Sequence, residues 1–166
     1  MQLTGKQIVE EGIITNLTEK AIQQQGVDVR IDIIRNVEGM GRIPKEGKTI
    51  LPVYKEIQPI KDEAGEHWTL FPGYYEIQFV EGCKIPSNRV MTVIQRSSLL
   101  RNGVIIRSSQ YDAGFETEHM GTFMVVNNPV IIEKGARIAQ TIILETADVD
   151  EDKLYNGQWQ RDNQRK

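Results

Sequence analysis

Short apolar runs separated by turn residues are the feature that most constrains the fold of this chain. The runs are rich in Val, Ile and aromatic residues, and Gly, Pro, Asn or Asp stands between them. Turn signals about every eight to twelve residues are typical of β-sandwiches and β-barrels. The sequence therefore predicts an all-β domain, with strands at residues 27–33, 50–57, 68–71, 75–79, 90–95, 104–107, 121–126, 130–132 and 138–144.

A short helix is predicted before the first strand. Thr4 and Gln7 have the spacing of a capping box, in which each side chain accepts a bond from the other residue's backbone N–H. Gly12 is expected to end this helix, because glycine readily adopts the left-handed conformation that follows a helix. The candidate apolar stripe consists of Ile8, Val9 and Ile13.

The first predicted strand alternates apolar and charged residues. Val27, Val29, Ile31 and Ile33 alternate with Asp28, Arg30 and Asp32. This period of two places the charges on one face of the strand. Two interpretations stay open: the charged face is solvated, or Asp28 and Arg30 face a subunit or ligand boundary.

A second short helix interrupts the strands near residue 99. Ser97 or Ser98 is expected to cap it, and Gly103 is a candidate for the residue just past its end. Backbone N–H groups, a hydroxyl group and the Arg96 guanidinium would then converge, which suits phosphate oxygens. The alternative is a capped helix with an exposed arginine.

Composition excludes several classes of function. A chain of 166 residues with 39 % hydrophobic and 26 % charged residues corresponds to one soluble domain, or one domain with a tail. Its net charge of −3 gives no electrostatic support for nucleic-acid binding. Cys83 is the only cysteine and the chain has two histidines, which argues against a disulfide or a Cys/His metal cluster. No apolar run suggests a signal peptide or a membrane span, so a cytoplasmic location is expected.

The stretch at residues 103–115 carries the strongest candidate for catalysis. A β-run leads into Asp112, which is followed by Ala-Gly and then by Phe115. Gly114 permits backbone angles that a side chain would forbid, so this turn can hold a carboxylate at the mouth of a pocket. Taken alone, the same residues also describe an ordinary hairpin turn.

Six short segments, taken in order, resemble the dUTPase and dCTP deaminase superfamily over nearly the whole chain. They are LTGKQI at 3–8, GVDVR at 26–30, QRSSL at 95–99, YDAGF at 111–115, GARIAQ at 135–140 and YNGQ at 155–158. The start, the Arg-Ser-Ser segment and the tail look like the deaminase branch. The resemblance implies a distorted jelly-roll barrel over residues 1–146, a flexible tail over 147–166 that closes over an active site, and a homotrimer with sites between subunits.

The resemblance also implies roles for individual residues. Asp112 matches the carboxylate that activates the attacking water, and Phe115 matches the aromatic residue that excludes a 2′-hydroxyl. Residues matching the nucleotide- and phosphate-binding segments are Arg96, Ser97, Ser98, Arg101, Gln140, Tyr155 and Gln158. Asp28 and Arg30 match a charged pair near the inter-subunit site. The implied sugar and base pocket comprises Ile106, Arg107, Ser108, Tyr111 and Phe115, and Mg²⁺ would be held chiefly by the triphosphate.

One departure separates the two activities of the superfamily. In the deaminase branch, a glutamate ten residues past the aspartate shuttles protons during deamination. Here that position is Thr122, whose hydroxyl cannot act as a general base at neutral pH. Glu116 and Glu118 are expected at the hairpin tip, together with His119 as a surface side chain.

The resemblance and Thr122 together predict a dUTP diphosphatase. Asp112 would orient water for attack at the α-phosphorus, while Mg²⁺, Arg96, Ser97 and Arg101 would neutralise the leaving diphosphate. Two alternatives stay open. One is a dCTP deaminase, mono- or bifunctional, and the other is a catalytically altered homologue that binds nucleotide or a regulatory partner.

Overall fold

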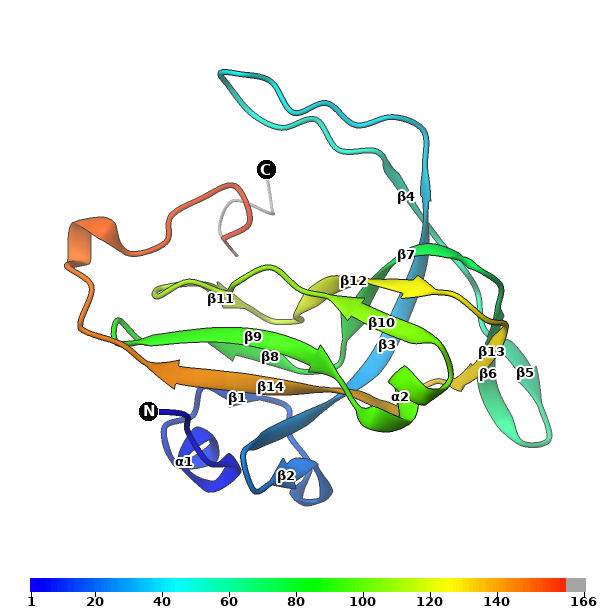
Figure 1. Ribbon diagram of the computed structural model, residues 1–166, viewed down its shortest axis with the longest axis horizontal. Helices are drawn as coiled ribbons and strands as arrows, with labels where there is room; N and C mark the ends of the chain where they lie inside the picture. The colour runs from blue at the N-terminus through cyan, green and yellow to red at the C-terminus, as the bar shows by residue number, and fades with distance from the viewer. Residues whose placement is uncertain (161–166) are drawn as a thin grey trace.

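Antiparallel strands wrap into a nearly closed barrel in the computed structural model, which describes residues 1–160 (Figure 1). The main sheet runs in the order β10, β12, β7, β3, β14 and β9, and β2 and β4 also pair with β3. Its strands are β2 Ile22–Gln23, β3 Gly26–Glu38, β4 Val53–Glu56, β7 Gly73–Phe79, β9 Arg89–Gln95, β10 Val104–Arg107, β12 Gly121–Val126 and β14 Arg137–Glu145. The predicted all-β jelly-roll-type barrel is therefore confirmed.

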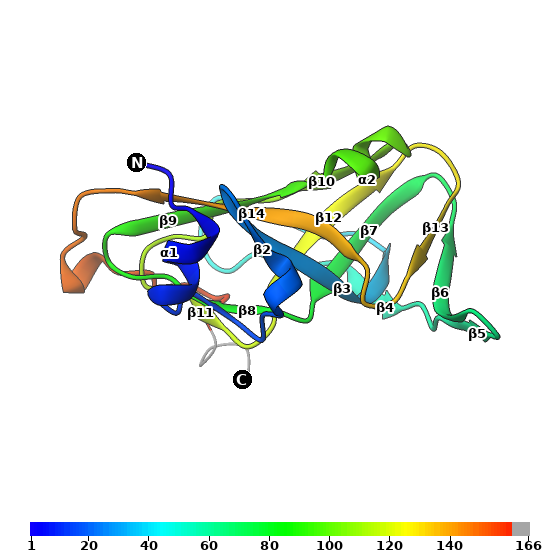
Figure 2. The ribbon, with the colours of Figure 1, turned by 90° about the horizontal axis from the view of Figure 1, so that it is seen from below.

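Two three-stranded sheets extend the barrel at its ends. One has the order β1, β8 and β11, and the other the order β13, β6 and β5. Their bounds are β1 Ile14–Thr15, β8 Gly82–Lys84, β11 Glu116–Thr117, β13 Val130–Glu133, β6 Gly65–Leu70 and β5 Ile60–Asp62. Figures 1 and 2 show the β5–β6 hairpin at the end of the molecule away from the N-terminal helix. Within residues 1–160, no helix has the length and apolar character needed to cross a membrane.

The N-terminal helix α1, Gly5–Glu10, has the predicted capping box. The Thr4 hydroxyl accepts from the Gln7 N–H, and the Gln7 side chain accepts from the Thr4 N–H. Gly12 follows the helix in the left-handed region, with φ of +63°. The predicted stripe was wrong at Val9, which is 42 % exposed, because a helix this short buries one narrow face through Ile8.

The second helix, α2 (Ser97–Arg101), is capped differently from the prediction. Its N-cap residue is Arg96, and no side chain makes the capping hydrogen bond. Ser97 and Ser98 already lie within the helix and are exposed, so the predicted serine cap was wrong. Gly103 follows α2 with φ of +76°, as predicted. Two 3₁₀ turns complete the helical elements, η1 at Glu19–Ala21 and η2 at Glu151–Lys153.

Edge strands β9 and β10 approach each other and nearly close the barrel. The Gln95 side-chain oxygen accepts from the Ile106 N–H at 3.1 Å, and the Ser108 hydroxyl accepts from the Val93 N–H at 3.4 Å. The interior is filled by fully buried side chains from most strands of the main sheet. Among them are Val29, Ile34, Ile77, Phe79, Met91, Met124 and Ile143.

A register shift in β3 changes which side chains face the core. Ile31 lies opposite Phe79 and Ile33 opposite Gln78, so one residue is unpaired between them. Beyond this bulge Ile34 is fully buried and Ile33 is only partly buried. The predicted alternation therefore holds up to Ile31, because a bulge reverses the parity of a strand.

Residues 39–52 leave the barrel as a long excursion between β3 and β4 (Figure 1). Arg42 and Ile50 form an isolated bridge within it. Met40 and Ile43 are 90 % and 88 % exposed. The strand predicted at 50–57 is shorter in the structure, at Val53–Glu56, because the residues before it belong to this excursion.

A buried carboxylate anchors the turn between β7 and β8 to β3. Glu81 is fully buried and accepts from the Arg30 backbone N–H at 2.7 Å and from Arg30 Nε at 2.6 Å. Arg30 also donates to the backbone oxygen of Asn16 at 2.7 Å. These bonds join three segments that are distant in the sequence.

We expect Glu81→Ala to lower the free energy of unfolding by about 3 kcal/mol, because removing one member of a buried ion pair leaves the other uncompensated. Urea denaturation should show a lower midpoint. Glu10→Ala is a matched control, since Glu10 pairs with Lys6 on the surface and should change stability by less than about 0.5 kcal/mol. Equal losses in both variants would contradict a structural role for the Arg30–Glu81 pair.

Candidate active site

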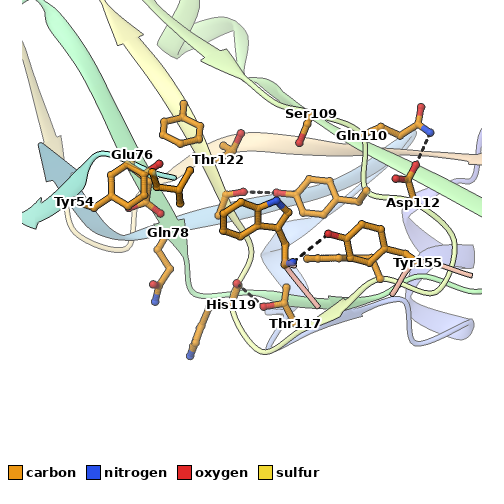
Figure 3. A pocket seen from close by; sticks show the side chains of 16 residues that line it. Tyr54, Glu76, Gln78, Ser109, Gln110, Asp112, Thr117, His119, Thr122 and Tyr155 are labelled. Atoms are coloured by element: carbon orange, nitrogen blue, oxygen red, sulfur yellow. Dashed lines mark hydrogen bonds between the residues drawn. The ribbon is translucent and has the colours of Figure 1, made fainter. Parts of the chain in front are cut away.

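A cavity of about 580 Å³ lies between the 109–123 segment, strands β4 and β7, and the C-terminal tail (Figure 3). In Figure 3, Gln110, Asp112 and Tyr155 lie at one end of it, and Tyr54 and Glu76 at the other. The lining residues are Leu51, Tyr54, Glu76, Gln78, Ser109, Gln110, Tyr111, Asp112, Phe115, Thr117, His119, Gly121, Thr122, Phe123, Tyr155 and Trp159.

The turn that presents Asp112 is tied down on both sides. Before it, Tyr111 exchanges backbone hydrogen bonds with Met91 of β9 at 2.8 and 3.1 Å. After it, the Phe115 N–H donates to the Asp112 backbone oxygen at 3.0 Å, and Gly114 has φ of +84°. The Asp112 side chain is exposed, and Gln110 Nε2 donates to its Oδ1 at 2.8 Å. The second carboxylate oxygen can therefore accept a proton from water.

Aromatic rings form the wall beside Asp112. Phe115 meets Tyr111 edge-on at 5.5 Å and Tyr155 edge-on at 5.3 Å. Tyr111 is buried, and its hydroxyl donates to the Gly121 backbone oxygen at 2.7 Å. Burial raises the pKa of Tyr111, so the phenol stays neutral and acts here as a structural donor. This wall offers a rigid apolar surface to a ligand.

Thr122 lines the same cavity as Asp112. It is buried on β12, and its hydroxyl donates to the Arg107 backbone oxygen at 2.8 Å. The side chain of Thr122 is thus a neutral hydroxyl whose hydrogen is already donated to the Arg107 backbone oxygen. It provides no proton-shuttling group.

The far end of the cavity contains a carboxylate that sequence reasoning missed. Glu76 lies opposite Phe123 in the β7–β12 pairing, and its side chain accepts from Arg35 Nη1 at 2.7 Å. Arg35 Nη2 also donates to Gln78 Oε1 at 3.1 Å. No sequence motif marks Glu76 or Gln78, because the register between β7 and β12 brings them to the cavity.

Only part of the predicted sugar and base pocket lines the cavity. Tyr111 and Phe115 line it, together with Ser109 and Gln110, which fall within the segment 106–112 whose main chain was expected to read the base but whose side chains were not among the predicted pocket residues. Ile106 instead points into the core, and Arg107 is exposed. Ser108 bonds to β9, as described above.

The predicted phosphate-binding residues of the Arg-Ser-Ser segment, Arg96, Ser97, Ser98 and Arg101, lie outside this cavity, near a second cluster of charged side chains. Arg96 Nε and Arg137 Nη1 each lie 3.3 Å from Asp28 Oδ2. Arg96 Nη1 also donates to the Arg137 backbone oxygen at 3.1 Å. Ser97, Ser98 and Arg101 are exposed on α2.

Asp28 is the buried centre of this second cluster. It is 1 % exposed, so the interpretation of a solvated charged face was wrong at this residue. Burial, the largest influence, raises the pKa of Asp28, and the guanidinium groups of Arg96 and Arg137 oppose that rise. Gln140 lies opposite Asp28 in the β14–β3 pairing, so it belongs to the same region.

The cavity and the second cluster carry different charges. Among the described residues that line the cavity, none is a lysine or an arginine, and the acidic ones are Asp112 and Glu76. The arginines belong to α2 and to the start of β14. The apolar wall of the cavity and the arginines around Asp28 therefore lie on separate parts of one chain.

The tail contributes two aromatic residues to the cavity. Tyr155 and Trp159 line it, whereas Gln158 is not among the lining residues. His119, predicted as a surface side chain, also lines the cavity while remaining exposed. Residues 161–166 of the predicted tail lie outside the described residues.

Metal ligands are not clustered in the part of the chain that the structure describes. No group of three or more His, Cys, Asp or Glu side chains is arranged there to hold a metal ion. Mg²⁺ prefers oxygen ligands and usually keeps several waters, with one or two carboxylates and the phosphates of a substrate. The exposed carboxylate of Asp112 on the cavity fits that limited contribution from protein.

Comparison with curated proteins identifies similar nucleotide hydrolases. The deoxyuridine 5′-triphosphate nucleotidohydrolase of Methanocaldococcus jannaschii is 41 % identical over 137 residues, which cover 81 % of this chain and 85 % of that protein. A probable deoxyuridine 5′-triphosphate nucleotidohydrolase of Halobacterium salinarum is 34 % identical over 148 residues, or 88 % and 87 % of the two chains. The probable enzyme of the same name from Aeropyrum pernix is 32 % identical over 161 residues, or 96 % and 98 %.

Structural comparison supports the same fold. The 2′-deoxycytidine 5′-triphosphate deaminase of Agrobacterium tumefaciens superposes with a TM-score of 0.63 at 12 % sequence identity. The match covers 88 % of this chain and spans about half of the deaminase chain, at 49 %. The model of the dCTP deaminase-like family matches residues 2–146, which is most of the chain. This protein therefore belongs to the dCTP deaminase-like family.

Proposed function

We propose that this protein hydrolyses dUTP to dUMP and diphosphate. The observation that carries the proposal is the set of side chains in one cavity: Asp112 lines it and is exposed, and the lining residue at the deaminase-glutamate position is Thr122, whose hydroxyl donates to the Arg107 backbone oxygen. The names of relatives at 32–41 % identity support the same substrate. Hydrolysis of the triphosphate requires a base for water, and it leaves the pyrimidine ring unchanged.

In the proposed reaction, Asp112 accepts a proton from a water molecule as that water attacks the α-phosphorus. The bond from the α-phosphorus to the oxygen that bridges it to the β-phosphorus breaks, and diphosphate leaves. Gln110 holds one carboxylate oxygen through its 2.8 Å hydrogen bond, which orients the other toward the water. When bound to the triphosphate, Mg²⁺ would reduce the negative charge of the phosphate oxygens.

Glu76 is a poor substitute for the missing deaminase glutamate. Its carboxylate accepts a hydrogen bond from the Arg35 guanidinium at 2.7 Å, and it lies at the other end of the cavity from Asp112 (Figure 3). A proton shuttle must reach both the attacking water and the pyrimidine ring. This placement favours hydrolysis over deamination as the activity of the cavity.

We also propose that the working unit is a homotrimer with sites shared between subunits. The cavity needs cations for a triphosphate, and among the described residues its lining offers none. Arg96, Ser97, Ser98 and Arg101 of a neighbouring copy would bind the phosphates, with Gln140 beside them. The exposure of Ser97, Ser98 and Arg101 on α2 supports this arrangement.

Asp112→Asn should lower kcat for dUTP by about 10²–10⁴, the usual contribution of a general base. The amide keeps an oxygen that can accept from Gln110, so dUTP affinity measured by calorimetry should change little. Asp152→Asn, at a side chain that is 73 % exposed, is the matched control. Each protein is assayed with Mg²⁺ for diphosphate release from dUTP and for ammonia release from dCTP. Unchanged turnover in Asp112→Asn, or ammonia release as fast as diphosphate release in the wild type, would refute the proposal.

Phe115 is expected to discriminate between dUTP and UTP. Its ring is 9 % exposed and lies between Tyr111 and Tyr155, so a 2′-hydroxyl would have to displace it. Phe115→Leu should reduce the ratio of kcat/KM for dUTP over UTP by about tenfold, the range set by small changes in an apolar pocket. A ratio equal to that of the wild type would show that another residue excludes the ribose hydroxyl.

A further inference from the structure

The side chain of Gln160 makes three hydrogen bonds, although Gln160 lies outside the six family-like segments of the sequence. Its Nε2 donates to the Gly114 backbone oxygen at 2.7 Å and to the Tyr155 backbone oxygen at 3.3 Å. Its Oε1 accepts from the Glu116 backbone N–H at 2.9 Å. The side-chain amide therefore binds the backbone on either side of Phe115, at Gly114 and at Glu116. It donates to one and accepts from the other, as a backbone peptide group of a neighbouring strand would.

The tail and this turn also fit closely in shape. The Tyr155 N–H donates to the Ala113 backbone oxygen at 2.8 Å. A Cβ atom added at Gly114 would lie 2.8 Å from Leu154 Cβ and 3.0 Å from the Tyr155 nitrogen. No side chain can stand between the tail and the turn, so the two segments form a packed contact.

The tail segment that Gln160 holds has its own internal support. The Tyr155 hydroxyl accepts from the Trp159 N–H at 3.2 Å, and the Gln160 N–H donates to the Gly157 backbone oxygen at 3.2 Å. A Cβ atom on Gly157 would lie 2.6 Å from that same hydroxyl. Tyr155 and Trp159 are thus held together as a unit at the cavity.

We propose that Gln160 is a positioning residue that fastens the tail over the cavity of its own chain and steadies the turn carrying Asp112. The inference rests on the proposed function for its effect on turnover. Closing the cavity with Tyr155 and Trp159 excludes water around the reacting phosphate and strengthens electrostatic contacts there. The same amide, through Gly114 and Glu116, limits movement of the backbone that positions the Asp112 carboxylate.

Gln160→Ala and Gln160→Glu test the role in turnover. Alanine removes all three bonds. Glutamate removes both donated bonds and places a carboxylate against two carbonyl oxygens. Each variant should lower kcat/KM for dUTP by about tenfold or more, as expected for two lost neutral hydrogen bonds. Gln24→Ala, at an exposed glutamine between β2 and β3, is the matched control and should match the wild type. Wild-type kcat/KM in both Gln160 variants would overturn the proposal.

The fluorescence of Trp159 reports on the packing of the tail when no substrate is bound. The chain has two tryptophans, and Trp68 is buried in the core. The contribution of Trp159 is obtained as the fluorescence difference between each protein and the same protein carrying Trp159→Phe. Gln160→Ala should shift the Trp159 emission to longer wavelength and lower its anisotropy, and Gln24→Ala should not. Unchanged Trp159 emission and anisotropy in Gln160→Ala would overturn the proposal.

Mixed oligomers decide whose cavity the tail covers. Chains carrying Asp112→Asn are co-expressed with chains carrying Gln160→Ala, under separate affinity tags, and doubly tagged protein is purified. If each tail serves its own chain, every intact Asp112 in the mixture has a defective tail, and activity stays at the sum of the two variants. Activity several-fold above that sum would show that an intact tail reaches a neighbour's Asp112, and would overturn closure within one chain.

The two proposals fail in different ways. If dUTP is not the substrate, the wild type shows no turnover, yet the Trp159 signal still separates Gln160→Ala from Gln24→Ala. If Gln160 does not fasten the tail, the wild type and both Gln160 variants hydrolyse dUTP equally and their Trp159 signals coincide.

Discussion

The need to pair buried charge on strand β3 determines how several distant segments are placed. Asp28 is buried between Arg96 and Arg137, which brings the start of α2 next to the start of β14. Arg30, two residues later, binds the fully buried Glu81 at the turn between β7 and β8. An unpaired charge at either place would cost several kcal/mol. The arrangement of helix, turn and strand ends around β3 therefore depends on these contacts.

That arrangement leaves the cavity and the arginine cluster on different parts of one chain. The cavity has an aromatic wall, two carboxylates and polar side chains, whereas Arg96 and Arg137 gather around Asp28. In the proposed trimer, a second copy would supply the cations for a triphosphate. In this structure the tail of the same chain completes the cavity with Tyr155 and Trp159. The tail packs directly against the turn at Gly114, where a Cβ atom would lie 2.8 Å from Leu154 Cβ.

Local sequence signals predicted the elements that depend on neighbouring residues. The Thr4 capping box, the left-handed glycines after both helices and most strands are governed by contacts a few residues apart. The bulge in β3 and the burial of Asp28 were not predictable in this way. Both depend on the register with β7 and β14, which is determined by packing across the barrel. The same reason explains the missed Glu76, which reaches the cavity through its pairing opposite Phe123.

The sequence by itself determined the family, the all-β class and the key residues of the Asp112 turn, because these follow from motifs, periodicity and glycine chemistry within short segments. It also identified Thr122 as the residue at the position of the deaminase glutamate. Only the tertiary structure decided that Ile106 belongs to the core, that Glu76 forms an ion pair with Arg35, and that Gln160 binds the backbone of Gly114 and Glu116. Those contacts join residues that are far apart along the chain, and their geometry is set by strand register and close packing.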